Sequence, residues 1–151
     1  MIGTPAPVFT LPATGGDSVS IESLRGKHVV LYFYPKDSTP GCTREGEQFR
    51  DLYAEFQRLG CEVFGISRDS LKSHENFKSK YAFPFGLLSD ADEAACQAYG
   101  VIKMKNMYGK QVRGIERSTF VIDASGVLRR EWRGVKVPDH AQEVLDFIAT
   151  L

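Results

Sequence analysis

Six consecutive apolar residues, Val29–Tyr34, constrain the fold of this chain more than any other segment. The run is rich in β-branched and aromatic side chains, contains no alternating polar residue and ends at Pro35. A strand with one solvated face would alternate apolar and polar residues, so this run predicts a central strand that is covered on both faces. Such a strand needs helices on both sides of its sheet, which indicates an α/β protein.

The remaining periodicities supply those helices and further strands. Apolar residues spaced by three and four predict helices over 42–59, 70–81, 90–99 and 138–151. The third of these is expected to open with a capping box made by Asp90 and Glu93. Strands are predicted over 8–11, 19–21, 62–67, 85–88, 118–122 and 127–132. By analogy, this order predicts a thioredoxin-like fold in one domain, residues 1–151, with a central mixed β-sheet flanked by helices and an N-terminal β extension.

Composition excludes several classes of function. Nineteen basic residues balance nineteen acidic ones in 151 residues, so neither nucleic acid nor a membrane is expected as a partner. The three cysteines are odd in number and form neither a CxxC pair nor a His/Cys cluster, so no disulfide framework, metal or cofactor is expected. The amino terminus lacks the basic start and apolar stretch of a signal peptide, and a reducing cytoplasm is the predicted location.

Cys42 is the strongest candidate for chemistry. It lies where a buried strand has ended and a helix begins, and unpaired backbone N–H groups at a helix N-terminus favour a thiolate over a thiol. Gly41 allows close approach of the backbone to a ligand, and Pro40 stiffens the entry to the helix. Thr39 places a hydroxyl three residues before the sulfur. The alternative, a small buried packing residue, fits this setting poorly.

A longer pattern surrounds this cysteine. Residues 34–45 read Tyr-Pro-Lys-Asp-Ser-Thr-Pro-Gly-Cys-Thr-Arg-Glu, and residues 49–51 read Phe-Arg-Asp. With the stretches Gly65–Asp69, Leu88–Asp90 and Glu116–Asp123, this pattern resembles the peroxiredoxins over essentially the whole chain. More narrowly, it resembles the bacterioferritin comigratory protein or peroxiredoxin Q branch of that family.

The resemblance implies a thiol-dependent peroxidase that acts on hydrogen peroxide and alkyl hydroperoxides. Cys42 would be the peroxidatic cysteine, which attacks the O–O bond and becomes a sulfenic acid. Thr39 would hydrogen-bond the peroxide and the thiolate, and Arg117 would stabilise the thiolate and polarise the substrate. Pro35 would shield the pocket from water, and Glu45 would orient arginine side chains.

Ionisation of the cysteine cannot supply the whole rate. A free cysteine is roughly 3% thiolate at pH 7, so complete ionisation gives only about thirtyfold. Most of the acceleration is therefore expected from donors that bind the stretched O–O bond of the transition state. The backbone N–H of Cys42, the Thr39 hydroxyl and the Arg117 guanidinium are the expected donors.

The chain departs from its apparent relatives in its second cysteine. Many members of the branch carry a resolving cysteine five residues after the peroxidatic one, or in the following helix; here these positions are Glu47 and Lys78. Of the two remaining cysteines, Cys96 is the better candidate for a resolving cysteine and Cys61 is the weaker. The sequence around each of them is typical of a small packing residue. A one-cysteine cycle is therefore expected, with thioredoxin, or glutaredoxin with glutathione, as the reductant.

Other readings stay open. A thioredoxin-type dithiol oxidoreductase is disfavoured by the missing CxxC, and a peroxide sensor or holdase switched by Cys42 oxidation is the alternative function. The sequence does not determine the oligomeric state, although the resemblance suggests a monomer. His28, His74 and His140 are expected to play no part in the chemistry. The basic stretch Lys103–Lys110 is expected to be a solvated loop, with a docking surface for the reductant as its alternative.

Overall fold

A mixed five-stranded sheet forms the centre of the molecule in a computed structural model that describes residues 2–151, Met107 by its backbone only. In spatial order the strands are β5 (Gly86–Ser89), β4 (Cys61–Ser67), β3 (His28–Phe33), β8 (Ser118–Ile122) and β9 (Leu128–Arg133). The first three are parallel, and β8 and β9 run antiparallel to their neighbours. The predicted mixed sheet is therefore confirmed, with β3 as its middle strand.

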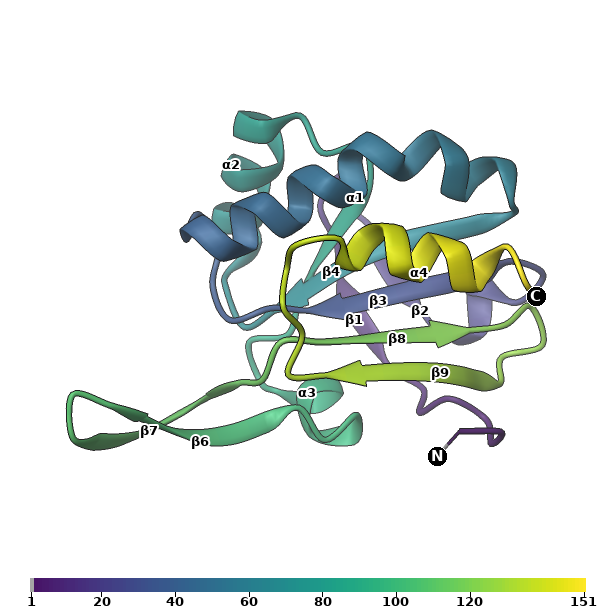
Figure 1. Cartoon of the computed structure of the whole chain (residues 1–151). Coiled ribbons are helices and arrows are strands. Elements are labelled where there is room, and N and C mark those ends of the chain that lie inside the picture. Colours follow the sequence, from purple (N-terminus) through teal and green to yellow (C-terminus); the bar gives the residue numbers. More distant parts are fainter. Residues whose placement is uncertain (1) are drawn as a thin grey trace.

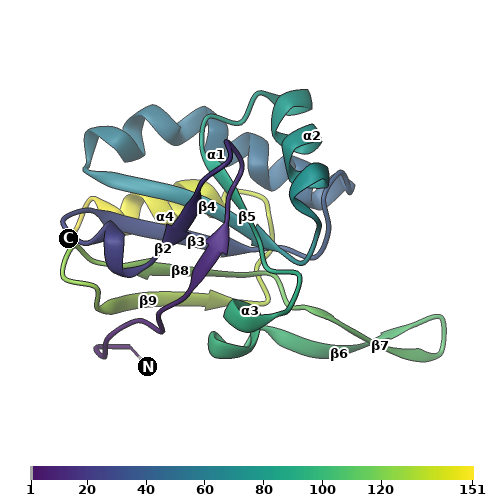
Figure 2. The ribbon, with the colours of Figure 1, turned by 180° about the vertical axis from the view of Figure 1, so that it is seen from behind.

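Helices cover one face of this sheet, and a thinner layer covers the other. The helices α1 (Pro40–Arg58), α2 (Leu71–Tyr81) and α4 (His140–Ile148) lie on the first face (Figure 1). On the opposite face lie the short α3 (Ala94–Ala98), the hairpin of β1 (Thr10–Pro12) with β2 (Ser18–Ser20), and the 3₁₀ turn Glu22–Leu24 (Figure 2). The β1–β2 hairpin is the predicted N-terminal extension.

Two hydrophobic cores follow from the alternation of side chains along β3. Val29, Leu31 and Phe33 belong to the core that contains α3, whereas Val30 and Tyr32 belong to the core beneath α1, α2 and α4. All five side chains are buried, because successive strand residues point to opposite faces and both faces are covered. The continuous apolar run in the sequence has this physical origin.

The predicted capping box of the third helix is wrong. The helix begins four residues later than expected, at Ala94, because Glu93 adopts a left-handed backbone conformation with φ of 64°. Its side chain makes no capping hydrogen bond and instead pairs with Arg68 at 3.0 Å. Asp90 caps from a distance, since its carboxylate accepts from the backbone N–H groups of Ala95 and Cys96 at 3.1 and 2.7 Å.

The stretch expected to be a basic loop is a β-hairpin. Strands β6 (Ile102–Met107) and β7 (Lys110–Ile115) pair along their whole length and project from the body of the protein (Figures 1 and 2). A two-residue turn joins them, in which Tyr108 and Gly109 both have positive φ values of 54° and 78°. This is the turn geometry that matches the twist of a hairpin. Few apolar residues mark these strands, because the arm contacts the core only at its base, through Ile102 and Ile115.

This topology brings three segments to one edge of the sheet. The parallel strands β3 and β4 end there, and the loop after β3 leads into α1. The antiparallel strand β8 begins at the same edge, since Ser118 pairs with Phe33 at the end of β3. Residues at the start of α1 and just before β8 therefore meet. Within residues 2–151, no helix combines the length and apolar character needed to cross a membrane.

Candidate active site

Cys42 is the third residue of α1, at the edge of the sheet where β3 ends. Thr39 is the N-cap, and the first backbone hydrogen bond of the helix runs from the N–H of Thr43 to the carbonyl of Thr39. Since Pro40 has no N–H, the backbone donors left for a ligand are those of Gly41 and Cys42. The positive end of a 19-residue helix thus lies at a thiol that is 2% exposed.

Arg117 joins the sulfur to a buried carboxylate. Its Nη2 donates to Cys42 Sγ at 3.3 Å, and its Nη1 donates to Glu45 Oε1 at 2.7 Å. The side chain is 16% exposed, and burial opposes its charge, but Glu45 and Cys42 outweigh that and raise the pKa of the guanidinium. Arg117 therefore stays cationic, and its position would allow it to stabilise negative charge on the sulfur or on a neighbouring oxygen.

Glu45 lies one turn after Cys42 on the same face of α1 and is 1% exposed. Burial raises the pKa of its carboxyl from 4.5 to about 7, although the neighbouring Arg117 works in the opposite direction. Its Oε2 atom is buried with no hydrogen-bond partner among residues 2–151. Glu45 thus orients one side of the guanidinium while the other side faces the sulfur.

The Thr39 hydroxyl has a different partner from the one expected. Its Oγ1 donates to the carbonyl of Lys36 at 2.8 Å, so its hydrogen is directed away from the thiolate. The oxygen keeps its lone pairs and can accept from the O–H of a hydroperoxide. Pro35 is half-buried directly after Tyr34, whose N–H donates to the carbonyl of Ile66 as the last bond of the ladder.

Gly41 leaves room for the guanidinium. A Cβ atom at this position would lie 3.2 Å from Arg117 Nη2, which is closer than carbon and nitrogen normally pack. The glycine therefore permits the contact between Arg117 and Cys42.

The sequence did not single out Lys105, a second cation near the site. It lies on the projecting hairpin, where its Nζ donates to the carbonyl of Ile115. Partial burial, together with the positive charge of Arg117, lowers the pKa of its ammonium group, while the sulfur of Cys42 acts in the opposite direction. The hairpin ends two residues before Arg117, and its strand pairing places Lys105 near that residue, which spacing along the chain does not reveal.

Cys61 lies far from Cys42. It pairs with His28 at the start of β3, whereas Cys42 follows the end of that strand, so the two are separated by about 16 Å of strand length. A disulfide needs Cα atoms within about 7 Å. Burial also raises the pKa of the Cys61 thiol to about 12, so it remains protonated at neutral pH.

Cys96 lies in the other core, on the α3 face of the sheet, whereas Cys42 belongs to the core beneath α1. It is completely buried, and burial together with Asp90 raises the pKa of its thiol well above the usual range. All three cysteines are free thiols. Neither Cys61 nor Cys96 is placed to reach Cys42 in this conformation.

A buried polar cluster supports the loop before α1. The possible metal-ligand atoms of Asp37, Asp69 and His74 lie within 4.8 Å of one another. Both ring nitrogens of His74 and both carboxylate oxygens of Asp37 already have protein partners, so these two side chains are satisfied without an ion.

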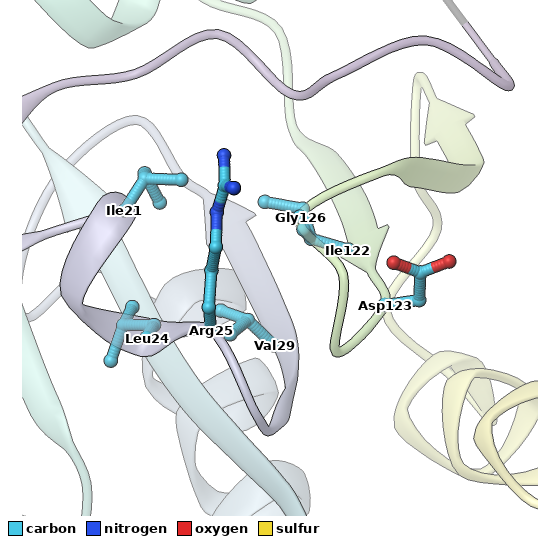
Figure 3. A pocket seen from close by; sticks show the side chains of 7 residues that line it. All are labelled: Ile21, Leu24, Arg25, Val29, Ile122, Asp123 and Gly126. Carbon is cyan, nitrogen blue, oxygen red and sulfur yellow. The ribbon is translucent and has the colours of Figure 1, made fainter.

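A shallow hollow lies at the opposite edge of the sheet, among Val29 at the start of β3, Ile122 at the end of β8, and the turn at Gly126 (Figure 3). Figure 3 shows the Arg25 side chain extending toward Gly126, while Asp123 points away from it. Asp123 pairs instead with Arg129 at 3.2 Å. This hollow is therefore separate from the cysteine site.

Comparison with known proteins places the chain among thiol peroxidases. The sequence pattern of the AhpC/TSA family matches residues 2–131. A putative peroxiredoxin Bcp of Coxiella burnetii is 51% identical over 144 residues, which cover 95% of this chain and 95% of that protein. The peroxiredoxin Bcp of Xanthomonas campestris is 54% identical over 143 residues, covering 93% of this chain and 89% of that protein.

Solved structures agree with these relatives. The bacterioferritin comigratory protein of X. campestris superposes with a TM-score of 0.90 at 51% identity, covering 94% of this chain and 90% of that one. A cysteine-to-serine variant of Xylella fastidiosa peroxiredoxin Q superposes with a TM-score of 0.95 at 42% identity, covering 99% and 96%. The thioredoxin-like fold is thereby confirmed. The chain belongs to the AhpC/TSA family and, within it, to the Bcp/peroxiredoxin Q branch of thiol-dependent peroxidases.

Proposed function

We propose that this peroxidase reduces hydrogen peroxide and alkyl hydroperoxides at Cys42 by a one-cysteine cycle in which an external thiol completes turnover. The observation that carries the proposal is the sulfur of Cys42 at a helix N-terminus, 3.3 Å from the Nη2 atom of Arg117. The related X. campestris protein has been studied for alkyl peroxide reduction, which supports this substrate class.

In the first step the Cys42 thiolate attacks the terminal oxygen of the hydroperoxide. An S–O bond forms as the O–O bond breaks, so the sulfur is oxidised to a sulfenic acid and the leaving oxygen is reduced. That oxygen departs as an alkoxide or hydroxide and takes up a proton, which gives an alcohol or water. Negative charge moves from sulfur to the leaving oxygen during this displacement.

The hydrogen-bond donors of the site are placed to stabilise this negative charge as it moves. Arg117 faces the sulfur, and the N–H groups of Gly41 and Cys42 are left unpaired by the helix. Thr39 Oγ1, whose hydrogen is donated to Lys36, can accept from the hydroperoxide O–H and hold it for attack. Fixed dipoles of this kind accelerate a reaction most when they bind the transition state better than the substrate. Pro35 and Glu45 support this pocket by excluding water and orienting Arg117.

An external thiol is proposed for the second step because Cys61 and Cys96 are remote and protonated. A first thiol attacks the sulfenic sulfur, forms a mixed disulfide and releases water. A second thiol then attacks that disulfide, which restores the Cys42 thiol and yields an oxidised dithiol. Thioredoxin, or glutaredoxin with glutathione, fits this requirement.

Peroxide consumption by the purified protein with dithiothreitol tests the proposal. Wild-type protein is expected to turn over hydrogen peroxide and cumene hydroperoxide, and Cys42→Ser is expected to be inactive. Cys61→Ser and Cys96→Ser should retain the wild-type rate. Slow turnover combined with peroxide-dependent protection of a client protein would favour the sensor or holdase alternative instead. We further propose that the enzyme is cytoplasmic and monomeric.

A further inference from the structure

We propose that Asp37 and His74 are positioning residues for this reaction: they form a buried hydrogen-bonded pair that holds the loop between β3 and α1 in its peroxide-binding form. The inference rests on the proposed peroxidase reaction at Cys42 and adds two residues to its machinery. The hydrogen bonds of these two side chains do not include the sulfur of Cys42, so their effect on its reaction is indirect.

Hydrogen bonds fix His74 through both of its ring nitrogens. Its side chain, on α2, is completely buried; Nδ1 lies 2.7 Å from Asp37 Oδ2, and Nε2 lies 2.9 Å from the carbonyl oxygen of Leu88 on β5. A carbonyl oxygen can only accept, so Nε2 donates to Leu88, and Nδ1 shares a hydrogen bond with the carboxyl group of Asp37. The ring therefore has one orientation, in which it directs Nδ1 at Asp37.

Asp37 is fixed from several directions. Its Oδ1 accepts from the hydroxyl of Tyr34 at 2.6 Å, and its Oδ2 accepts from the hydroxyl of Ser73 at 2.8 Å in addition to His74. Its backbone N–H donates to Asp69 Oδ2 at 2.9 Å. Side chains from the residue after β3, from α2 and from the loop after β4 therefore hold a single residue of the loop.

The neighbours of Asp37 carry this constraint to the site. The carbonyl of Lys36 on one side receives the hydroxyl of Thr39. On the other side Ser38 has a φ of 63°, a left-handed conformation that is strained for a non-glycine residue and persists only where its surroundings enforce it. Two residues later α1 begins, with its free N–H groups at Cys42. Moving Asp37 would therefore displace the peroxide acceptor and the helix start together.

Stability alone explains such a buried polar pair poorly, because apolar side chains of similar volume often stabilise a fold as well. The pair instead fixes the direction of Asp37, whose carboxyl group can satisfy all of its partners in only one orientation. This predicts a defect that is specific for peroxide, since alkylation of the thiolate by iodoacetamide needs no bound hydroperoxide.

The test compares two rate constants in the full-length reduced protein. Oxidation of Cys42 by hydrogen peroxide is followed by competition with horseradish peroxidase, and alkylation by iodoacetamide is followed by mass spectrometry. Asp37→Ala and His74→Phe are expected to lower the peroxide rate by about tenfold or more while alkylation stays within about twofold of wild type. His28→Phe, a histidine substitution at the far end of β3, is the matched control and should leave both rates unchanged.

A conservative variant separates positioning from folding. In Asp37→Asn the amide oxygen can still accept from Tyr34 and the amide nitrogen can donate to His74 Nδ1, so most of the peroxide rate should return. If Asp37→Ala does not fold, Asp37→Asn and His74→Gln carry the comparison, and the His74 variant should be the slower.

The inference is overturned if folded variants keep the wild-type peroxide rate, or if both rates fall in parallel. These outcomes differ from failure of the proposed function, in which wild-type protein itself would not react with hydrogen peroxide at Cys42.

Discussion

Replacing Glu45 by glutamine should change how stability depends on pH. The buried carboxyl has a pKa of about 7 in the folded protein and an ordinary value of 4.5 when unfolded, because burial penalises its charged form. Between these two values the folded state holds a proton that the unfolded state releases. The stabilising contribution of the Glu45 carboxyl group is therefore fully present below pH 4.5 and is lost as the pH rises through about 7.

The structure sets the size of this effect. The difference between 4.5 and about 7 corresponds to about 3 kcal/mol, at roughly 1.4 kcal/mol for each pH unit. This is a large part of the 5–15 kcal/mol that typically stabilises a domain of about this size. Glutamine cannot ionise, yet its Oε1 can still accept from Arg117, so Glu45→Gln should escape this loss.

Urea denaturation of reduced wild-type and Glu45→Gln protein between pH 4.5 and 8 provides the measurement. The free energy of unfolding of the variant, relative to wild type, should rise by about 3 kcal/mol across this range and then level off. Glu47→Gln is the matched control, because that side chain is 41% exposed on the same helix, and its pH dependence should parallel that of wild type. Parallel curves for wild type and Glu45→Gln would refute the reasoning.

Three further substitutions test the site and its surroundings. Arg117→Ala should slow oxidation of Cys42 by hydrogen peroxide by about a hundredfold. This loss should exceed the loss of thiolate at Cys42, which stopped-flow kinetics and a thiolate titration measure side by side. A rate loss that the thiolate fraction fully explains would contradict the prediction. Gly41→Ala should slow oxidation several-fold, because its Cβ would lie 3.2 Å from Arg117 Nη2 and crowd the guanidinium; an unchanged rate contradicts that contact. Lys103→Glu, on the projecting hairpin, should slow reduction by thioredoxin but not by dithiothreitol; Lys72→Glu on α2 is the control, and equal effects would exclude docking at the arm.

The strands and helices that build the cores could be predicted because their apolar residues report burial directly. The central strand 29–34 and the first helix show this, since both bury side chains at the spacing that their geometry imposes. The projecting hairpin could not be found in this way, because hydrophobic periodicity records contact with a core and the arm has little. The start of α3 was misplaced because Glu93 takes a left-handed conformation that side-chain type does not favour.

The residues of the candidate site likewise include some that the sequence could predict and some that it could not. Cys42, Thr39 and Glu45 lie within seven residues, so a local motif could propose them, and Arg117 came only from the resemblance to a family. His74 was assigned no part in the chemistry, because its partner Asp37 lies 37 residues away and the two meet only where α2 packs beside the end of β3. A contact of that kind depends on topology, which no spacing along the chain reveals.

The central claim is that Cys42 alone takes the oxygen from the peroxide and has no partner within its own chain. Intact-mass spectrometry of reduced protein treated with one equivalent of hydrogen peroxide, with and without a sulfenic-acid trap, tests it most directly. The account predicts a species heavier by one oxygen atom that the trap captures at Cys42, together with free thiols at Cys61 and Cys96. A species lighter by two hydrogen atoms, with Cys42 disulfide-bonded to Cys61 or Cys96, would contradict it.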